Sequence, residues 1–172
     1  GGTASTPAAP QGVVATLPAG QSVTWGKEPV EEQGPRRAVV CLNGLWKFQP
    51  AFGPAVAAPD PGSGKGWIRV PGSWRPGNLA GLTPATGPAW QGFSSNSPVA
   101  WYERELSIPA GWAGRKIVVV LERVSTDATV FIDGRELGRV AWPDGEVDIS
   151  AAGEPGKTHA LAIKVVAVAD RD

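Results

Sequence analysis

Two groups of acidic residues have a spacing from which catalytic carboxylates could be built. Glu103 and Glu105 stand two positions apart, and Asp144, Glu146 and Asp148 repeat that spacing. In a strand such neighbours share a face at roughly 7 Å, whereas retaining glycosidases hold their two carboxyl groups about 5 Å apart. We therefore interpret both groups as solvated strand faces and expect no catalysis by this chain alone.

The other reactive side chains occur singly. His159 is the only histidine and Cys41 the only cysteine, which excludes an intrachain disulfide and disfavours a histidine-based zinc site or a catalytic triad. Apolar neighbours predict that Cys41 is buried and inert, and we expect His159 at the surface or in a turn. The segment Gly62-Ser63-Gly64-Lys65 lacks the first glycine and the final hydroxyl of a phosphate loop, so it is interpreted as an ordinary loop.

Tryptophan is the strongest indication of binding, with eight copies in 172 residues. An indole can stack on the apolar face of a sugar ring while its N–H donates a hydrogen bond. Trp90 lies beside Gln91 and shortly before Asn96, so an aromatic ring stands among amide and hydroxyl groups, as a sugar site requires. Trp142 is a second candidate. The competing interpretation is that Trp90 and Phe93 only pin their loop to the fold.

Short strands are expected to position these residues. Glycine (23) and proline (17) separate the apolar segments, and no window shows clean helical periodicity, which is typical of an all-β protein. The expected strands are 36–42, 67–70, 101–108, 116–124, 127–132, 135–141, 146–149 and 160–168. They predict a jelly-roll β-sandwich, with four tryptophans in or near its core: Trp46, Trp67, Trp74 and Trp101.

Local signals refine this prediction. Asp133-Gly134 between alternating segments predicts a type I′ hairpin. Asn43-Gly44 predicts a turn after which the chain pairs back or continues as a second strand. The unbroken apolar run within 116–124 indicates a strand covered on both faces. Residues 75–98 form a long irregular connection, which is often functional.

Composition limits the possible partners. Lys plus Arg equals Asp plus Glu at 16 each, so no electrostatic footprint for nucleic acid or an anionic membrane is expected. No apolar run approaches the ~20 residues of a membrane span. Residues 1–20 are expected to form a flexible segment, with its Ala, Pro, Thr and Ser content suggesting an extracytoplasmic protein, and residues 21–172 a single sandwich domain.

Several segments also follow a recognisable order. They are Leu42-Asn43-Gly44-Leu45-Trp46-Lys47-Phe48, Val70-Pro71-Gly72-Ser73-Trp74, Trp101-Tyr102-Glu103-Arg104-Glu105-Leu106, Pro109 with Trp112 and Gly114, Val124 with Thr126, Ala128 and Val130, then Gly138, Asp148-Ile149-Ser150 and Leu161-Ala162-Ile163-Lys164-Val165. Over about residues 38–168 this order resembles the N-terminal sugar-binding domain of family 2 glycoside hydrolases, the group of β-galactosidases, β-glucuronidases and β-mannosidases. Two departures stand out. Ala141-Trp142-Pro143-Asp144-Gly145 replaces a longer aromatic loop. The family's catalytic glutamates lie on a (β/α)₈ barrel far downstream, and this sequence stops at Asp172, before such a barrel could begin.

The resemblance implies a galactose-binding-like sandwich that packs against a catalytic barrel and helps to shape a cleft for a β-glycoside. Its carbohydrate-contacting candidates here are Trp90, Gln91, Asn96 and Trp142. No cofactor is expected, although related modules often carry a structural calcium ion; Asp60, Asp127 and Asp133 follow no calcium-loop pattern, so no ligand is assigned. Two alternatives stay open: a free-standing carbohydrate-binding module, and a structural or protein-interaction sandwich.

Overall fold

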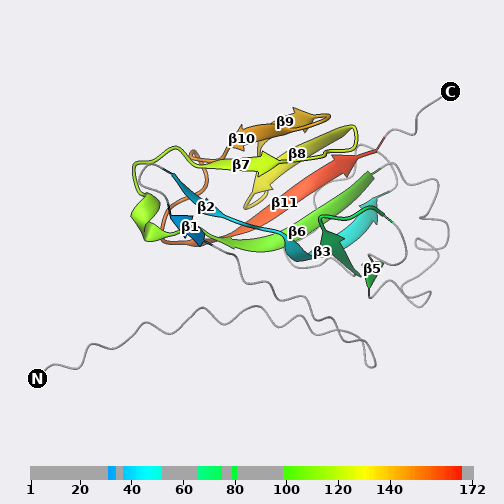
Figure 1. Ribbon diagram of the computed structural model, residues 1–172, viewed down its shortest axis with the longest axis horizontal. Helices are drawn as coiled ribbons and strands as arrows, with labels where there is room; N and C mark the ends of the chain where they lie inside the picture. The colour runs from blue at the N-terminus through cyan, green and yellow to red at the C-terminus, as the bar shows by residue number, and fades with distance from the viewer. Residues whose placement is uncertain (1–30, 34–36, 52–65, 75–78, 81–98, 168–172) are drawn as a thin grey trace, which may run out of the picture.

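The chain is all-β in the part that the computed structural model describes, which is residues 31–33, 37–51, 66–74, 79–80 and 99–167. The strands are β1 (Glu31–Gln33), β2 (Ala38–Val40), β3 (Gly44–Ala51), β4 (Gly66–Val70), β5 (Leu79–Ala80), β6 (Val99–Ser107), β7 (Val118–Leu121), β8 (Asp127–Ile132), β9 (Arg135–Ala141), β10 (Gly145–Asp148) and β11 (Thr158–Val166). A short 3-10 turn, η4 (Ala110–Trp112), follows β6 (Figure 1). These residues include no helix of the length and apolarity that a membrane span needs.

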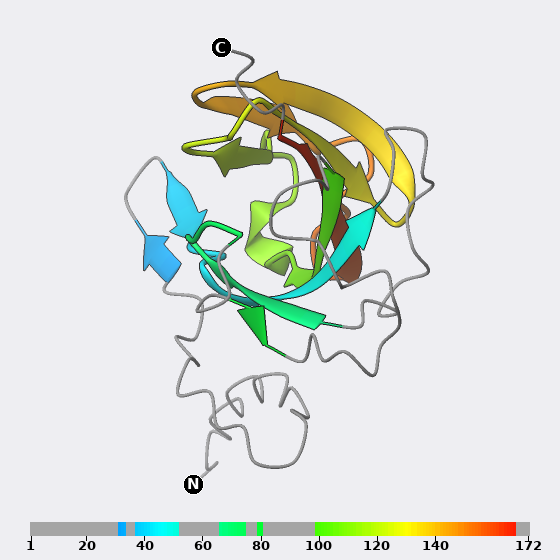
Figure 2. The ribbon, with the colours of Figure 1, turned by 90° about the vertical axis from the view of Figure 1, so that its right-hand side faces the viewer.

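The strands form a sandwich of two unequal layers. The larger layer is a seven-stranded sheet in the order β5-β4-β3-β6-β11-β8-β9, and the smaller layer is the pair β10-β7. All the pairings in these two layers are antiparallel. In Figure 2 the large sheet curves from β9 round to β4, and β7 lies on its concave side. The predicted all-β sandwich is therefore confirmed.

The core lies between the two layers. The register places Phe48, Tyr102, Ile163 and Val130 in one row across four adjacent strands, and directly opposed residues in a sheet share a face. The smaller layer contributes the buried side chains of Val119 and Val147 to the same cluster, and Ile149, directly after β10, adds a third. Alternation along β8 and β11 accounts for this arrangement, because every second residue points inward.

Two glycine–valine pairs let β9 and β10 approach closely where the layers meet. A Cβ atom on Gly138 would lie 2.9 Å from Cγ1 of Val147, and one on Gly145 would lie 2.8 Å from Cγ1 of Val140. Both valines are buried, at 4% and 5% exposed. Close packing therefore requires glycine at both positions, because any side chain there would occupy the space of the valine that faces it.

Several predictions about the strands need correction. The run 116–124 was expected to be covered on both faces, but β7 spans only Val118–Leu121 and Val120 is 60% exposed. A two-stranded layer has one face on the core and leaves the other to solvent. The expected turn at Asn43-Gly44 separates β2, which pairs with β1, from β3, which pairs with β4 and β6. Gly44 has φ 136°, a backbone conformation that favours glycine.

The prediction for Cys41 was wrong, because its side chain is exposed. Cys41 lies between the end of β2 and the start of β3, where the chain passes from one sheet to another. The apolar neighbours on which the prediction rested do not form a continuous buried strand here: Val39 is 55% exposed. An apolar run indicates burial only where both of its faces are covered.

Candidate functional site

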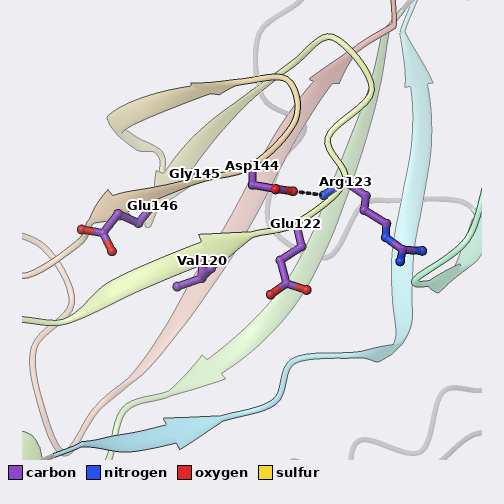
Figure 3. A pocket seen from close by; sticks show the side chains of 6 residues that line it. All are labelled: Val120, Glu122, Arg123, Asp144, Gly145 and Glu146. Carbon is purple, nitrogen blue, oxygen red and sulfur yellow. Dashed lines mark hydrogen bonds between the residues drawn. The ribbon is translucent and has the colours of Figure 1, made fainter.

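A shallow pocket lies on the outer side of the smaller layer and is the candidate site. Its volume is about 440 Å³. It is formed by the end of β7, the start of β10 and the segments that precede or follow them (Figure 3). The lining residues are Val120, Glu122, Arg123, Asp144, Gly145 and Glu146.

Three hydrogen bonds tie together the two segments that wall this pocket. The Arg123 backbone N–H donates to Oδ1 of Asp144 at 2.7 Å (Figure 3). The Val124 N–H donates to the Pro143 carbonyl at 2.8 Å, and the Trp142 N–H donates to the Thr126 carbonyl at 2.8 Å. The turn between β9 and β10 is therefore fixed to the chain between β7 and β8.

The pocket is rich in hydrogen-bond acceptors. Glu122, Asp144 and Glu146 contribute carboxylates, which accept hydrogen bonds from hydroxyl groups. Lys116 lies 3.5 Å from Glu146, but both side chains are about 60% exposed, so this ion pair is weak. In Figure 3 the Arg123 side chain extends away from Glu146. The wall is consequently acidic, with the exposed methyl groups of Val120 as its apolar part.

Trp142 begins the turn that carries Asp144 and is 71% exposed. This places an indole within two residues of the pocket wall. Trp142 is thus the one sequence-predicted site residue that lies within the described part of the chain. The other three, Trp90, Gln91 and Asn96, lie outside the described residues and stay predictions.

Asp148 shares the spacing of Asp144 and Glu146 but has a structural role. The Ser150 side chain and then the Ser150 backbone N–H hold the pKa of Asp148 below its ordinary value. The Ser150 hydroxyl oxygen also accepts the Ile117 N–H at 2.9 Å. Asp148 therefore stabilises the turn after β10, and unlike Asp144 and Glu146 it is not among the residues that line the pocket.

The expectation that Glu103 and Glu105 share a solvated face holds for only one of them. Glu105 is exposed, whereas Glu103 is 7% exposed. Glu103 lies directly opposite Lys47 on β3 and Ala162 on β11, and the next residue on that face is the buried Trp101. The prediction failed because the convex face of the large sheet is covered around Trp101 as well as the concave one.

His159 was expected at the surface or in a turn, and this prediction was wrong. It lies at the start of β11 with its side chain 6% exposed. Its ring contacts Asp133 and the Glu154 carbonyl. The usable signal in the sequence was the regular alternation of 159, 161, 163 and 165, which places His159 on the core face.

The described residues contain no group of three or more His, Cys, Asp or Glu side chains that could hold a metal ion. Asp127 instead accepts a hydrogen bond from Arg139 at 2.6 Å, and Asp133 bonds to His159. Asp60 lies outside the described residues.

The aromatic residues of the sequence segments that carry the family resemblance form a structural network. The Trp74 indole N–H donates to the Tyr102 hydroxyl, and Phe48 packs edge-on against both rings at centroid distances of 6.2 and 5.2 Å. Burial raises the pKa of Tyr102, so its phenol stays neutral. These residues join β3, β6 and the segment after β4, and they do not line the pocket.

A second part of this network holds the start of β3. The Leu42 carbonyl accepts the Trp46 indole N–H at 2.7 Å and a guanidinium N–H of Arg104 at 2.6 Å. Arg104 also lies over the Trp46 ring, 5.5 Å from its centroid. Arg104, which stands between Tyr102 and Leu106 on the inward face of β6, therefore has both a hydrogen-bond partner and a cation–π partner. Trp46 and Trp101 are 4% and 2% exposed, which confirms their predicted burial.

Solved structures similar to this chain include three β-glucuronidases. The enzyme of Faecalibacterium prausnitzii matches with a TM-score of 0.56 and 24% identity, over 73% of this chain and 20% of that chain. The likeness is one of fold. The Ruminococcus gnavus enzyme in complex with C6-substituted uronic isofagomine has a TM-score of 0.52 and 24% identity, over 73% and 21% of the two chains. The Dictyoglomus thermophilum β-D-glucuronidase has a TM-score of 0.50 and 16% identity, over 73% and 19%.

No family model matches the chain, and no curated protein matches it either. This chain spans only about a fifth of the length of the similar enzymes, 19–21%. The comparison therefore does not show that this chain acts on the substrates of those enzymes.

Proposed function

We propose that this chain is the N-terminal sugar-binding domain of a family 2-type glycoside hydrolase, or a relative of that domain, with a galactose-binding-like jelly roll and no catalysis of its own. The observation that carries the proposal is the unequal coverage of the two chains: the match covers 73% of this chain but only 20% of the F. prausnitzii enzyme. The order of the sequence segments supports it independently. In a parent enzyme the domain would pack against the catalytic barrel and shape the cleft for a β-glycoside.

Two experiments test this proposal. The reading frame beyond Asp172 is expected to continue into a further sandwich and a (β/α)₈ barrel, which a stop codon at that point would contradict. The purified 172-residue chain is expected to release no aryl group from aryl β-glucuronides, β-galactosides or β-mannosides. Turnover that co-purifies with the chain through two different columns would show that it has catalytic groups of its own.

A second candidate is a free-standing carbohydrate-binding module, which the pocket beside Trp142 favours. The acceptor-rich wall and an indole 71% exposed are suited to a saccharide. Carboxylates at Glu122, Asp144 and Glu146 would repel a uronate, so neutral sugars are the expected ligands of this pocket. The sequence candidates Trp90, Gln91 and Asn96 would supply further contacts.

Replacing Trp142 by alanine is expected to weaken saccharide binding roughly ten-fold, because it removes the stacking surface. The melting temperature should stay within about 1 °C of the original, since an exposed side chain contributes little to stability. Isothermal titration with galactosides, glucosides, mannosides and glucuronides measures the first effect, and thermal unfolding the second.

Val39→Ala is the matched control, because Val39 is exposed and lies on β2, which belongs to neither of the two segments that wall the pocket. It should leave the affinity unchanged. If no saccharide in the panel binds the original chain, the module is excluded and the structural or protein-interaction sandwich becomes the better alternative.

A further inference from the structure

The buried imidazole of His159 has an acceptor at each of its two nitrogens. Nδ1 lies 2.6 Å from Oδ2 of Asp133, which is in the turn between β8 and β9. Nε2 lies 3.0 Å from the carbonyl oxygen of Glu154, which is in the segment between β10 and β11. A carboxylate and a backbone carbonyl can only accept hydrogen bonds. Both contacts must therefore be donated by the ring.

A neutral imidazole has one N–H and can satisfy only one of these acceptors. The other nitrogen would then point a lone pair at an oxygen atom in a buried position, which is unfavourable. The Asp133 acceptor cannot easily turn away. Oδ1 of Asp133 is held by the Ala160 N–H at 2.8 Å, and the Asp133 N–H donates to the Ala160 carbonyl at 2.9 Å.

We propose that His159 is held as an imidazolium and acts as a pH-dependent clasp that fastens the β8–β9 turn and the segment 149–157 to the start of β11. Opposite His159 on β6 lies the apolar Leu106. Besides Asp133, the acidic neighbour is Glu154, whose carboxylate pairs with Lys157 at 2.8 Å and is 61% exposed. The pair Asp133–His159 is thus the principal charge interaction of the clasp.

The electrostatics agree with the geometry. The Asp133 hydrogen bond, against the opposing effect of burial, raises the pKa of His159 above its ordinary 6.5, and the Glu154 carbonyl adds to this. The hydrogen bond from His159 holds the pKa of Asp133 below its ordinary 3.8. The stabilisation from His159 is therefore complete below pH 6.5 and is lost as the pH rises through the raised pKa. The stabilisation from Asp133 is lost in acid, as the pH falls through the lowered pKa.

The clasp is independent of the proposed carbohydrate role. The pairing of β8 with β9 runs from Asp127 opposite Ala141 to Ile132 opposite Arg135. The pocket and Trp142 adjoin the first end of this hairpin, and Asp133 adjoins the other. Failure of one proposal would leave the other unaffected.

Titration of the ring by long-range ¹H–¹⁵N NMR tests the clasp directly, and the single histidine makes its signals unambiguous. At pH 6 both ring nitrogens are expected at protonated shifts, with a titration midpoint above 6.5. Asp133→Asn should lower this midpoint, because it removes the charge while an Asn-Gly turn and the acceptor for Ala160 are kept. Glu154→Gln is the matched control and should lower the midpoint less.

Thermal unfolding gives a second readout. The melting temperature of the original chain is expected to fall by roughly 2–4 °C between pH 6 and pH 9, and Asp133→Asn should flatten this dependence. A midpoint at or below 6.5 in the original chain, or a midpoint that Asp133→Asn leaves unchanged, would overturn the proposal. A neutral tautomer at pH 6 would also overturn it.

Discussion

Phe48→Ala is expected to lower the free energy of unfolding by about 3–5 kcal/mol, the range for removing a buried aromatic side chain. Phe48 is 0% exposed in the core cluster. Its ring packs against both Trp74 and Tyr102. Removing the ring therefore also removes the packing that supports the hydrogen bond between these two residues. Natural domains have only 5–15 kcal/mol of stability, and the variant should be largely unfolded at moderate urea concentrations.

Urea unfolding followed by circular dichroism measures this effect. Val120→Ala is the control, because Val120 is an apolar strand residue that is 60% exposed, and it should change stability by no more than about 0.5 kcal/mol. If Phe48→Ala cost less than about 1 kcal/mol, the aromatic network would not be the centre of the core.

The second large effect is expected where the two layers touch. Gly138→Ala should destabilise the chain by about 1–3 kcal/mol, since the new methyl group would stand 2.9 Å from Cγ1 of the buried Val147. The same argument applies to Gly145→Ala, whose Cβ atom would stand 2.8 Å from Cγ1 of Val140. In each case the valine is held in the core and cannot turn outward.

A double-mutant cycle isolates this contact from other effects of the substitution. Val147→Ala removes the clashing methyl groups, so its cost in the Gly138→Ala background should be smaller than its cost alone. Gly111→Ala is the matched control, because nothing lies within 4 Å of the position of its Cβ atom. Strictly additive costs for Gly138→Ala and Val147→Ala would show that the close approach of β9 and β10 is not required.

The sequence predicts most of the large sheet because the burial of each strand is visible in its own pattern of apolar and polar residues. In β8 and β11 apolar and polar residues alternate, and Asp133-Gly134 requires the positive φ values that the structure shows at both positions. The positions of β4 and β9, and of β10 in the smaller layer, were predicted to within a few residues for the same reason.

Three of the four wrong predictions of burial have a common physical origin. Whether Cys41, Val120 and Glu103 are buried or exposed depends on what another segment places over them, and that is a property of the tertiary structure. Val120 stands in a run of valines that suggests two covered faces, yet its layer has only two strands in the described residues. His159 looked like a surface residue by type alone, although its position in the alternation already placed it inward.

The candidate site was predictable only in part. Trp142, an aromatic residue beside turn-forming residues, was a sequence candidate for a sugar contact, and its side chain is 71% exposed. The pocket beside it depends on Arg123 and Asp144, which are 21 positions apart in the chain and are joined by one hydrogen bond. No local pattern signals such a contact, because it arises only when β7 and β10 pair.

The place of β11 in the sheet has a consequence for synthesis. It is the last strand to be translated among those described, yet it lies between β6 and β8 and pairs with both. On the ribosome, strands β3 to β6 and the β8–β9 hairpin must therefore emerge as two separate sheet fragments, each with an unpaired edge strand. They can join only once the closing strand has left the exit tunnel, so a nascent chain halted before Thr158 should be a strong substrate for chaperones and proteases.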